Sequence, residues 1–191
     1  MISIEHIKRF VEGHRRREIS KPNLKKAAVL MLFYLKGNNL YVLLTRRTED
    51  VEHHKGQISF PGGSQDEEDS DLIGTALRES EEEIGLERDN VEVLGVFDDF
   101  EIPTGFAVTP VIAYAQSLPR LIPNAIEVAE ILEVPVELFL HRENERVEHR
   151  VWRGVLYDVF FYRYGENEIW GATAAILRAF LLSLRDAASD R

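Results

Sequence analysis

A short acidic stretch holds the residues of this chain whose types and spacing could do chemistry. The segment FPGGSQDEEDSDLIGTALRESEEEIGL, residues 60–86, contains two adjacent glycines, then nine acidic residues with Arg78 as the single basic one. On a helix of about 100° per residue, Glu82 and Glu83 fall within about 60° of Glu79, so three carboxylates share one edge. Like charges at this spacing weaken a helix by roughly a few tenths of a kcal/mol per pair. A hard divalent cation among them would reverse the sign of that effect.

The glycines next to this cluster point to a phosphate ligand. Gly62 and Gly63 precede the acidic helix, and glycine lets a backbone bring N–H groups close to phosphate oxygens. Mg²⁺ takes oxygen ligands and is commonly bound by one or two carboxylates together with substrate phosphates. The combination predicts a metal–diphosphate site in which Glu79, Glu82 and Glu83 supply the ligands. The alternatives are a solvated acidic face and an ordinary glycine turn.

The composition limits the class of protein. The chain has 191 residues, 45% of them hydrophobic, which suits one domain with a sizeable core. It has no cysteine and no apolar run approaching the roughly 18 residues that a membrane span needs, so we expect a cytoplasmic protein without membrane contact. A net charge of -10 argues against a nucleic-acid surface, because such surfaces neutralise phosphates with Lys and Arg. An anionic substrate would need a bridging cation.

Hydrophobic periodicity predicts the elements that position the site. Apolar, partly β-branched runs indicate strands, and the sequence KGNN between the first two indicates a hairpin turn. Apolar residues at helical spacing from Leu72 to Ile84, followed by Gly85, predict the acidic helix. Strands outnumber helices and do not alternate with them, which favours an α+β fold with a mixed sheet. The expected strands are residues 27–35, 40–45, 91–97, 107–115 and 155–164, and the other expected helices are residues 3–16, 134–140 and 173–184.

The chain divides into residues 1–25, an N-terminal helix and linker, and residues 26–191, the main domain. Ile4, Ile7 and Val11 fall at helical spacing behind Ser3, a suitable N-cap. The basic sequence HRRR at 14–17 is expected to form a solvated helix end, with electrostatic steering of an anionic substrate as the alternative.

The acidic helix resembles the Nudix box, G-x5-E-x7-R-E-U-x-E-E-x-G-U, in which U is aliphatic. The first half of the box differs here, because Asp69 takes the place of the glutamate and eight residues separate it from Arg78. The second half is present at positions 78–86, with serine in place of one aliphatic residue, as Arg78, Glu79, Ser80, Glu82, Glu83, Gly85 and Leu86.

A longer signature is similar to that of one Nudix subgroup, the coenzyme A pyrophosphatases. Their pattern L-L-T-x-R followed by G-x3-F-P-G-G is present at residues 43–47 and 56–63. The segments TGFAVTPV, EVAEILEVP and IWGATAAIL are also similar, so the resemblance spans roughly residues 26–184. Glu52 stands where the subgroup usually has arginine, which weakens the coenzyme A assignment more than the hydrolase assignment.

This resemblance implies both a fold and a reaction. The fold is an α/β/α sandwich built on a mixed sheet, and the reaction is hydrolysis of a nucleoside diphosphate linked to another group. With coenzyme A as substrate, the products are 3′,5′-ADP and 4′-phosphopantetheine. NADH and ADP-ribose are alternative substrates, and a non-hydrolysing nucleotide-binding module is an alternative of a different class. The family also implies a possible homodimer.

The resemblance implies roles for individual residues as well. Arg78 is expected to hold a carboxylate of the box, and Glu127 either completes a metal site or serves as general base. Arg47 is a candidate phosphate contact, because a guanidinium can bind phosphate oxygens in bidentate fashion, with a surface salt bridge as the alternative. Asp66 and Asp69 are outer metal ligands or charges that favour a helix N-terminus. The ligands of Mg²⁺ or Mn²⁺ are Glu79, Glu82 and Glu83.

Overall fold

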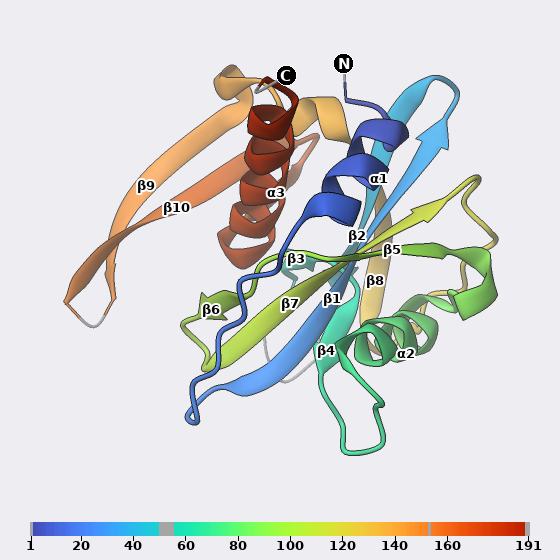
Figure 1. The fold of residues 1–191 in the computed structure, drawn as a ribbon, viewed down its shortest axis with the longest axis horizontal. Coiled ribbons are helices and arrows are strands. Elements are labelled where there is room, and N and C mark those ends of the chain that lie inside the picture. The colour runs from blue at the N-terminus through green and yellow to red at the C-terminus, as the bar shows by residue number, and fades with distance from the viewer. Residues whose placement is uncertain (1, 50–55, 153, 190–191) are drawn as a thin grey trace.

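A mixed β-sheet forms the centre of the molecule (Figure 1). The computed structural model describes residues 2–49, 56–152 and 154–189. Four long or central strands follow the order β2, β1, β7, β5, and β1 runs parallel to β7 while the other neighbours are antiparallel. Their bounds are β1 (Lys25–Lys36), β2 (Asn39–Arg47), β5 (Glu92–Val96) and β7 (Phe106–Ala115).

Shorter strands extend this sheet, and a second sheet flanks it. Strands β3 (Ile58–Ser59) and β8 (Val128–Pro135) pair with β2, β4 (Gly62–Ser64) pairs with β1, and β6 (Phe100–Ile102) pairs with β7. The second sheet has the order β11, β10, β9, with bounds β9 (Glu145–Trp152), β10 (Val155–Tyr164) and β11 (Asn167–Trp170). Short 3₁₀ turns lie at Arg88–Asn90, Val136–Phe139 and Arg142–Asn144.

Helices cover the two faces of the central sheet. One apolar core lies under α2 (Leu72–Ile84), where Leu77 and Ile84 pack with Leu43 of β2. The other lies under α1 (Ile4–Gly13) and α3 (Gly171–Ser189), where Ile7 and Phe180 are fully buried. The arrangement confirms the predicted α+β sandwich with a mixed sheet. None of the helices in the described ranges has the length and apolar character required to cross a membrane.

The sequence predicted the apolar strands better than the charged ones. All five expected strands are present as β1, β2, β5, β7 and β10, and Gly37 in the hairpin turn has a φ of 63°. The expected helix at 134–140 is a 3₁₀ turn at Val136–Phe139. Strands β8 and β9 were not predicted, because VAEILEVP and ERVEHRVW are rich in charged residues that are uncommon in strands.

The N-terminal helix is capped as expected but ends earlier than expected. The Ser3 side chain accepts a hydrogen bond from the His6 N–H, and the helix ends at Gly13 rather than at residue 16. The chain leaves the helix there because the next residues bind the buried carboxylates of Asp98 and Asp99, whose side chains are 6% and 2% exposed. HRRR therefore lies beyond the helix end, and its expected solvation holds for Arg15 and Arg17 but is wrong for His14 and Arg16.

Asp98 and Asp99 attach the N-terminal segment to the sheet. Arg16 donates from Nε and Nη2 to the two carboxylate oxygens of Asp99 at 2.9 Å each. Asp98 accepts from the Arg17 N–H at 2.8 Å and pairs with His14 at 2.9 Å. Burial alone would raise the pKa of both aspartates, but these hydrogen bonds outweigh it and lower both pKa values. The carboxylates therefore stabilise the fold above the ordinary aspartate pKa, and this stabilisation is lost as the pH falls through the lowered values.

Replacing Asp99 with alanine should destabilise the protein strongly. The change leaves the Arg16 guanidinium buried without its carboxylate, and breaking a buried pair in this way costs about 3 kcal/mol of unfolding free energy. Urea denaturation measures the loss. The matched control is Glu101→Ala, which removes an exposed ion pair with Lys21 and should cost less than about 1 kcal/mol. Equal losses for the two variants would show that the Asp99 pair does not anchor the segment.

Candidate active site

Helix α2 carries the predicted carboxylates, and local signals define both of its ends. The Asp71 side chain accepts a hydrogen bond from the Gly74 N–H at 2.7 Å, which caps the first turn. Gly85 ends the helix with a φ of 66°, a left-handed conformation that glycine adopts without strain. Ser80, where the Nudix box has an aliphatic residue, is fully buried and donates to the Ala76 carbonyl.

Glu83 is a carboxylate held out of water. Its side chain is 4% exposed, with one oxygen accepting from the Gly62 N–H at 3.1 Å and the other 3.3 Å from Arg47 Nη1. Burial raises the pKa of Glu83 to about 7; Gly62 and Arg47 act in the opposite direction, and the charges of Glu79 and Glu127 add to the rise. The ionised form is therefore poorly compensated by the protein itself.

Glu79 lies directly over Gly63. A Cβ atom at position 63 would come within 2.4 Å of the Glu79 carboxyl carbon, so only glycine leaves room for this side chain. Burial raises the pKa of Glu79, and the nearby guanidinium of Arg78 reduces that rise. The expectation that both glycines face phosphate stays a prediction, but their immediate contacts are with carboxylates: Gly62 donates to Glu83 and Gly63 accommodates Glu79.

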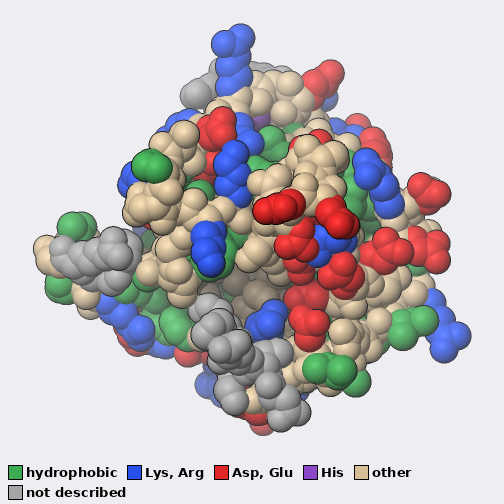
Figure 2. Space-filling view, turned by 90° about the horizontal axis from the view of Figure 1, so that it is seen from below, with side chains coloured by type: hydrophobic (Ala, Val, Ile, Leu, Met, Phe, Trp, Pro, Cys, Tyr) green, Lys and Arg blue, Asp and Glu red, His purple; other side chains and the backbone are tan. Residues whose placement is uncertain are grey.

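Arg78 connects the helix to the loop before it. Its Nε and Nη2 donate to the two oxygens of Asp69 at 2.9 and 3.0 Å, and Nη2 also donates to the Ser64 carbonyl. Its Nη1 lies 3.0 Å from Glu79 and 3.2 Å from Glu82. Figure 2 views this end of the molecule and shows acidic side chains gathered around basic ones. Arg78 therefore links four carboxylates of the segment, because its Nη2 also lies 3.6 Å from Asp66.

Asp69 has a role that sequence reasoning missed. Its carboxylate accepts from the Thr75 hydroxyl at 2.8 Å and from the Asp66 N–H at 2.9 Å, in addition to the pair with Arg78. The hydrogen bonds from Arg78 are the largest cause of its lowered pKa. Asp69 is thus an anchor for Arg78, and Asp71, not Asp66 or Asp69, caps the helix. In the sequence, the one indication of a pair between Asp69 and Arg78 is the Arg-Glu dipeptide of the Nudix box, which begins nine residues after Asp69.

Arg47 faces the same carboxylates from the end of β2. The pairing of β2 with β8 shifts register between Arg46 and Arg47, so that Arg46 lies opposite Glu130 and Arg47 opposite Val128. Such bulges re-aim side chains near functional sites. The Arg47 side chain is 24% exposed, and its Nε is buried without a hydrogen-bond partner among the described residues. It is therefore more than a surface salt bridge.

Glu127 is brought to the site by a turn that joins α2 to β2. The Asn124 N–H donates to the Glu83 carbonyl at 2.8 Å, and the Thr48 N–H donates to the Glu127 carbonyl at 2.9 Å. The Thr48 hydroxyl also donates to the Ile126 carbonyl at 2.6 Å. The half-buried Glu127 side chain is close enough for its charge to raise the pKa of Glu83. Glu52 lies outside the described residues.

The carboxylates of the site are donors that a divalent metal could use. Across residues 2–49, 56–152 and 154–189, no three His, Asp or Glu side chains form a ready-made metal cage. Mg²⁺ does not require one, because substrate phosphates and water supply much of its coordination. Glu79 and Glu83 offer oxygen donors whose raised pKa values report uncompensated negative charge. Their chemistry fits a hard cation.

The NUDIX domain family model matches residues 24–152, about two thirds of the chain. The chain belongs to the Nudix family. "Uncharacterized Nudix hydrolase NudL" of Pectobacterium atrosepticum is 39% identical over 153 residues, 76% of this chain and 76% of that protein. "Nudix hydrolase 15, mitochondrial" of Arabidopsis thaliana is 41% identical over 160 residues, 80% of this chain but only 56% of that protein.

Solved Nudix structures share the fold. The Nudix hydrolase RenU of M. smegmatis superposes with a TM-score of 0.51 at 27% identity, covering 59% of this chain and 71% of RenU. A MutT/nudix family protein of Enterococcus faecalis gives a TM-score of 0.52 at 17% identity, covering 100% of this chain and 71% of that one, which supports the fold alone. Together with the sequence relatives, these matches identify the chain as a Nudix hydrolase.

The raised pKa of Glu83 predicts how metal-free stability depends on pH. The folded chain keeps a proton on Glu83 up to about pH 7, whereas the unfolded chain releases it near the ordinary value, so stability should fall as the pH rises between these limits. Glu83→Gln mimics the protonated form. Urea denaturation in EDTA should find the variant equal to the parent at pH 5 and more stable by roughly 2 kcal/mol at pH 8. Parallel pH curves for parent and variant would contradict the assignment, and Glu81→Gln is the control.

The two adjacent glycines should respond differently to alanine. In Gly62→Ala, the new Cβ meets the Ala28 carbonyl oxygen at 2.4 Å and the φ of 150° is strained, so unfolding free energy should drop by about 3 kcal/mol or more. In Gly63→Ala, the Cβ displaces the flexible Glu79 carboxylate, so the fold persists while activity falls at least about tenfold. Thermal melting and steady-state kinetics separate the two effects. A fully active Gly63→Ala variant would refute the role given to Glu79.

Proposed function

We propose that this Nudix hydrolase is a metal-dependent pyrophosphohydrolase that cleaves the diphosphate of coenzyme A or its derivatives to 3′,5′-ADP and 4′-phosphopantetheine. The single observation that carries the hydrolase mechanism is the pair of desolvated carboxylates, Glu79 and Glu83, beside the Arg47 guanidinium, whose buried Nε has no hydrogen-bond partner in the described part of the chain. The choice of coenzyme A is supported by the subgroup signature at residues 43–47 and 56–63.

The proposal gives each group in the site a task. Glu79, Glu82 and Glu83 hold Mg²⁺ or Mn²⁺, which when bound neutralises phosphate charge and activates water. Arg78, fixed by Asp69, keeps Glu79 and Glu82 in position. Arg47 offers the exposed part of its guanidinium to a phosphate oxygen and orients the diphosphate for in-line attack.

A proton must leave the attacking water as its oxygen bonds to phosphorus and the bridging P–O bond breaks. Glu127 is the candidate acceptor, since it reaches the site from outside the metal-binding helix and is half-buried. Each product leaves with a terminal phosphate.

The site chemistry is shared by other nucleoside diphosphate conjugates. The Nudix fold neighbours include an Ap4A hydrolase of C. elegans, at a TM-score of 0.50 and 17% identity. Glu52 departs from the coenzyme A signature, so NADH and ADP-ribose remain the alternative substrates. A non-hydrolysing module is disfavoured because all three box glutamates are present.

A substrate panel with product analysis tests the proposal. Coenzyme A, an acyl-coenzyme A, NADH and ADP-ribose are incubated with Mg²⁺ or Mn²⁺, and chromatography identifies the products. We expect the highest kcat/KM and 3′,5′-ADP with the coenzyme A substrates. Glu82→Gln should lose roughly 100-fold, about 2.7 kcal/mol of transition-state stabilisation, while Glu81→Gln on the opposite face of α2 stays active. A preference for NADH or ADP-ribose would overturn the substrate, and hydrolysis of none of the four would overturn the function.

A further inference from the structure

The exposed apolar side chains of this protein are concentrated on one ribbon. Strands β9 and β10 extend past α3 and away from the central sheet (Figure 1). Of the eight large hydrophobic side chains that are exposed among the described residues, five lie on this ribbon: Val147, Val151, Val155, Leu156 and Tyr157. Val151, Val155 and Leu156 are each at least 65% exposed. Val147, Val151 and Leu156 share one face of the ribbon, because Val151 pairs with Leu156, whereas Val155 and Tyr157 lie on the other face. Apolar exposure on a single ribbon of this kind marks an interaction surface.

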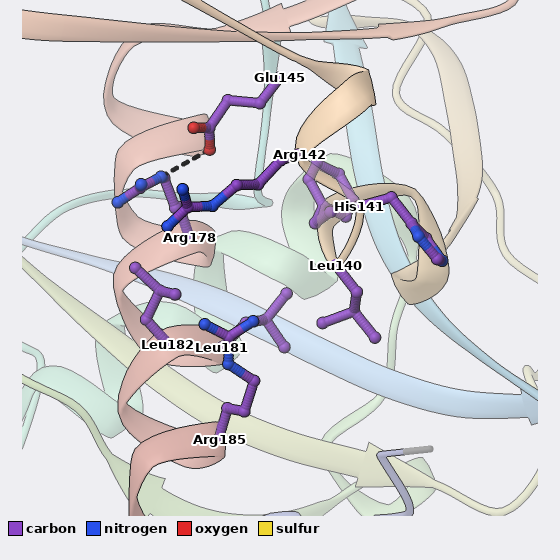
Figure 3. Close-up of a pocket in the computed structure, with 9 residues that line it drawn as sticks. Leu140, His141, Arg142, Glu145, Arg178, Leu181, Leu182 and Arg185 are labelled. Carbon is purple, nitrogen blue, oxygen red and sulfur yellow. Dashed lines mark hydrogen bonds and ion pairs between the residues drawn. The ribbon is translucent and has the colours of Figure 1, made fainter.

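The ribbon is anchored only at its base. Glu145 accepts a hydrogen bond from Arg178 of α3 at 2.6 Å, next to the depression lined by Leu181 and Arg142 (Figure 3). Strand β11 pairs with β10 only from Phe161 to Tyr164. Further out the ribbon has two strands, and an isolated two-stranded hairpin is at best marginally stable in water. A third strand added along β9 would stabilise it.

We propose that a second copy of this chain supplies that strand, and that β9 pairs with the β9 of its partner in antiparallel fashion with His149 on the two-fold axis. Strand β9 is an edge strand, because the sheet order is β11, β10, β9 among the described residues. Its outer N–H and C=O groups are therefore available for pairing. The result is a continuous sheet across two protomers.

The residue order of β9 selects this register. With His149 opposite its own copy, Glu148 lies opposite Arg150 of the second copy, and Arg150 opposite its Glu148. A shift by two residues brings either Glu148 or Arg150 opposite itself, which is destabilising for like charges. A shift by one residue brings the wrong faces together. A register centred on Val147 would also pair opposite charges, Arg146 with Glu148, but it places Val151 beyond the start of the partner's β9 and leaves that side chain without an apolar partner.

The same register completes the apolar rows. Val147 lies opposite Val151 of the second copy, and within one chain Val151 already pairs with Leu156 and Val147 with Phe160. Each row therefore reads Leu, Val, Val, Phe across four strands, with two residues from each copy. His149 is opposite Asp158 within the chain, at 2.7 Å, so each imidazole retains a carboxylate partner beside the axis. Apolar burial and charge pairing agree on one alignment.

The interface is small, and this sets the strength to expect. One strand pair and two apolar rows fall toward the low end of protein interfaces, below about 1,200 Å². We therefore expect a monomer–dimer equilibrium that depends on concentration. The inference does not rest on the proposed function, because β9 contributes none of the carboxylates of α2.

Sedimentation of the full chain across concentrations, with charge-altered variants, tests the pairing. Arg150→Glu places two glutamates opposite each other and should weaken dimerisation at least tenfold, as should Glu148→Arg. The double variant with both substitutions restores opposite charges in the same register and should dimerise like the parent. Arg88→Glu, an exposed reversal elsewhere, is the control for net charge. A chain that is monomeric at all concentrations, or a dimer indifferent to Arg150→Glu, overturns the proposal.

The absence of cysteine from the sequence allows a direct test of register. His149→Cys puts two thiols opposite each other across the axis, where antiparallel partners have Cα atoms about 4.5 to 5.5 Å apart, within disulfide range. Mild oxidation should give a covalent dimer. In Val147→Cys the two thiols are four residues out of line, about 13 Å apart along the strands, and should not join. Equal cross-linking of the two variants would refute this register.

Discussion

The site depends on one constraint. The fold holds the carboxylates of Glu79 and Glu83 against the sheet with too little positive charge beside them to balance their ionised forms. Among the described residues, one backbone N–H and the Arg47 guanidinium at 3.3 Å offset the burial of Glu83, and Glu79 shares Arg78 with three other acids. A carboxylate removed from water favours its neutral form unless positive charge is added. The fold therefore leaves on α2 an excess of negative charge that a divalent cation would relieve. Keeping the Glu79 and Glu83 carboxylates in place lowers the stability of the protein when no cation is bound.

The position of that charge depends on a very short strand. Strand β4 lies along β1 with Val29 opposite Gly62 and Ala28 opposite Gly63. The backbone of β1 leaves no space for a side chain at Gly62, and the Glu79 carboxylate occupies the space over Gly63. The Arg78 guanidinium also donates to the Ser64 carbonyl, and the Gly62 N–H donates to Glu83. Helix α2 is therefore hydrogen-bonded to both ends of β4. Since β1 is the central strand of the sheet and is buried over most of its length, the carboxylates inherit the rigidity of the core.

The sequence predicted what depends on local pattern. Helix α2, its carboxylates and the apolar strands follow from spacing alone, and the Nudix resemblance identified the arginine that aligns the acids. Sequence pattern did not predict contacts between residues that are far apart in the chain. Arg47 and Glu83 are 36 positions apart, and Arg17 and Asp98 are 81 positions apart. The bulge that turns Arg47 toward the site depends on β8, whose charged sequence does not look like a strand. Tertiary pairing, not propensity, decides such positions.

Electrostatics also limits how a substrate reaches the site. The chain carries a net charge of -10, and acidic side chains gather on one part of the face that Figure 2 shows. The basic segment at 14–17 offers little steering, because Arg16 and His14 are already paired with buried aspartates. An anionic diphosphate would thus meet repulsion on approach. A divalent cation bound among these carboxylates would reduce that repulsion, so the proposed mechanism requires cation binding to precede or accompany substrate binding. The acidic surface and the proposed hydrolysis would thus both depend on a bound divalent cation.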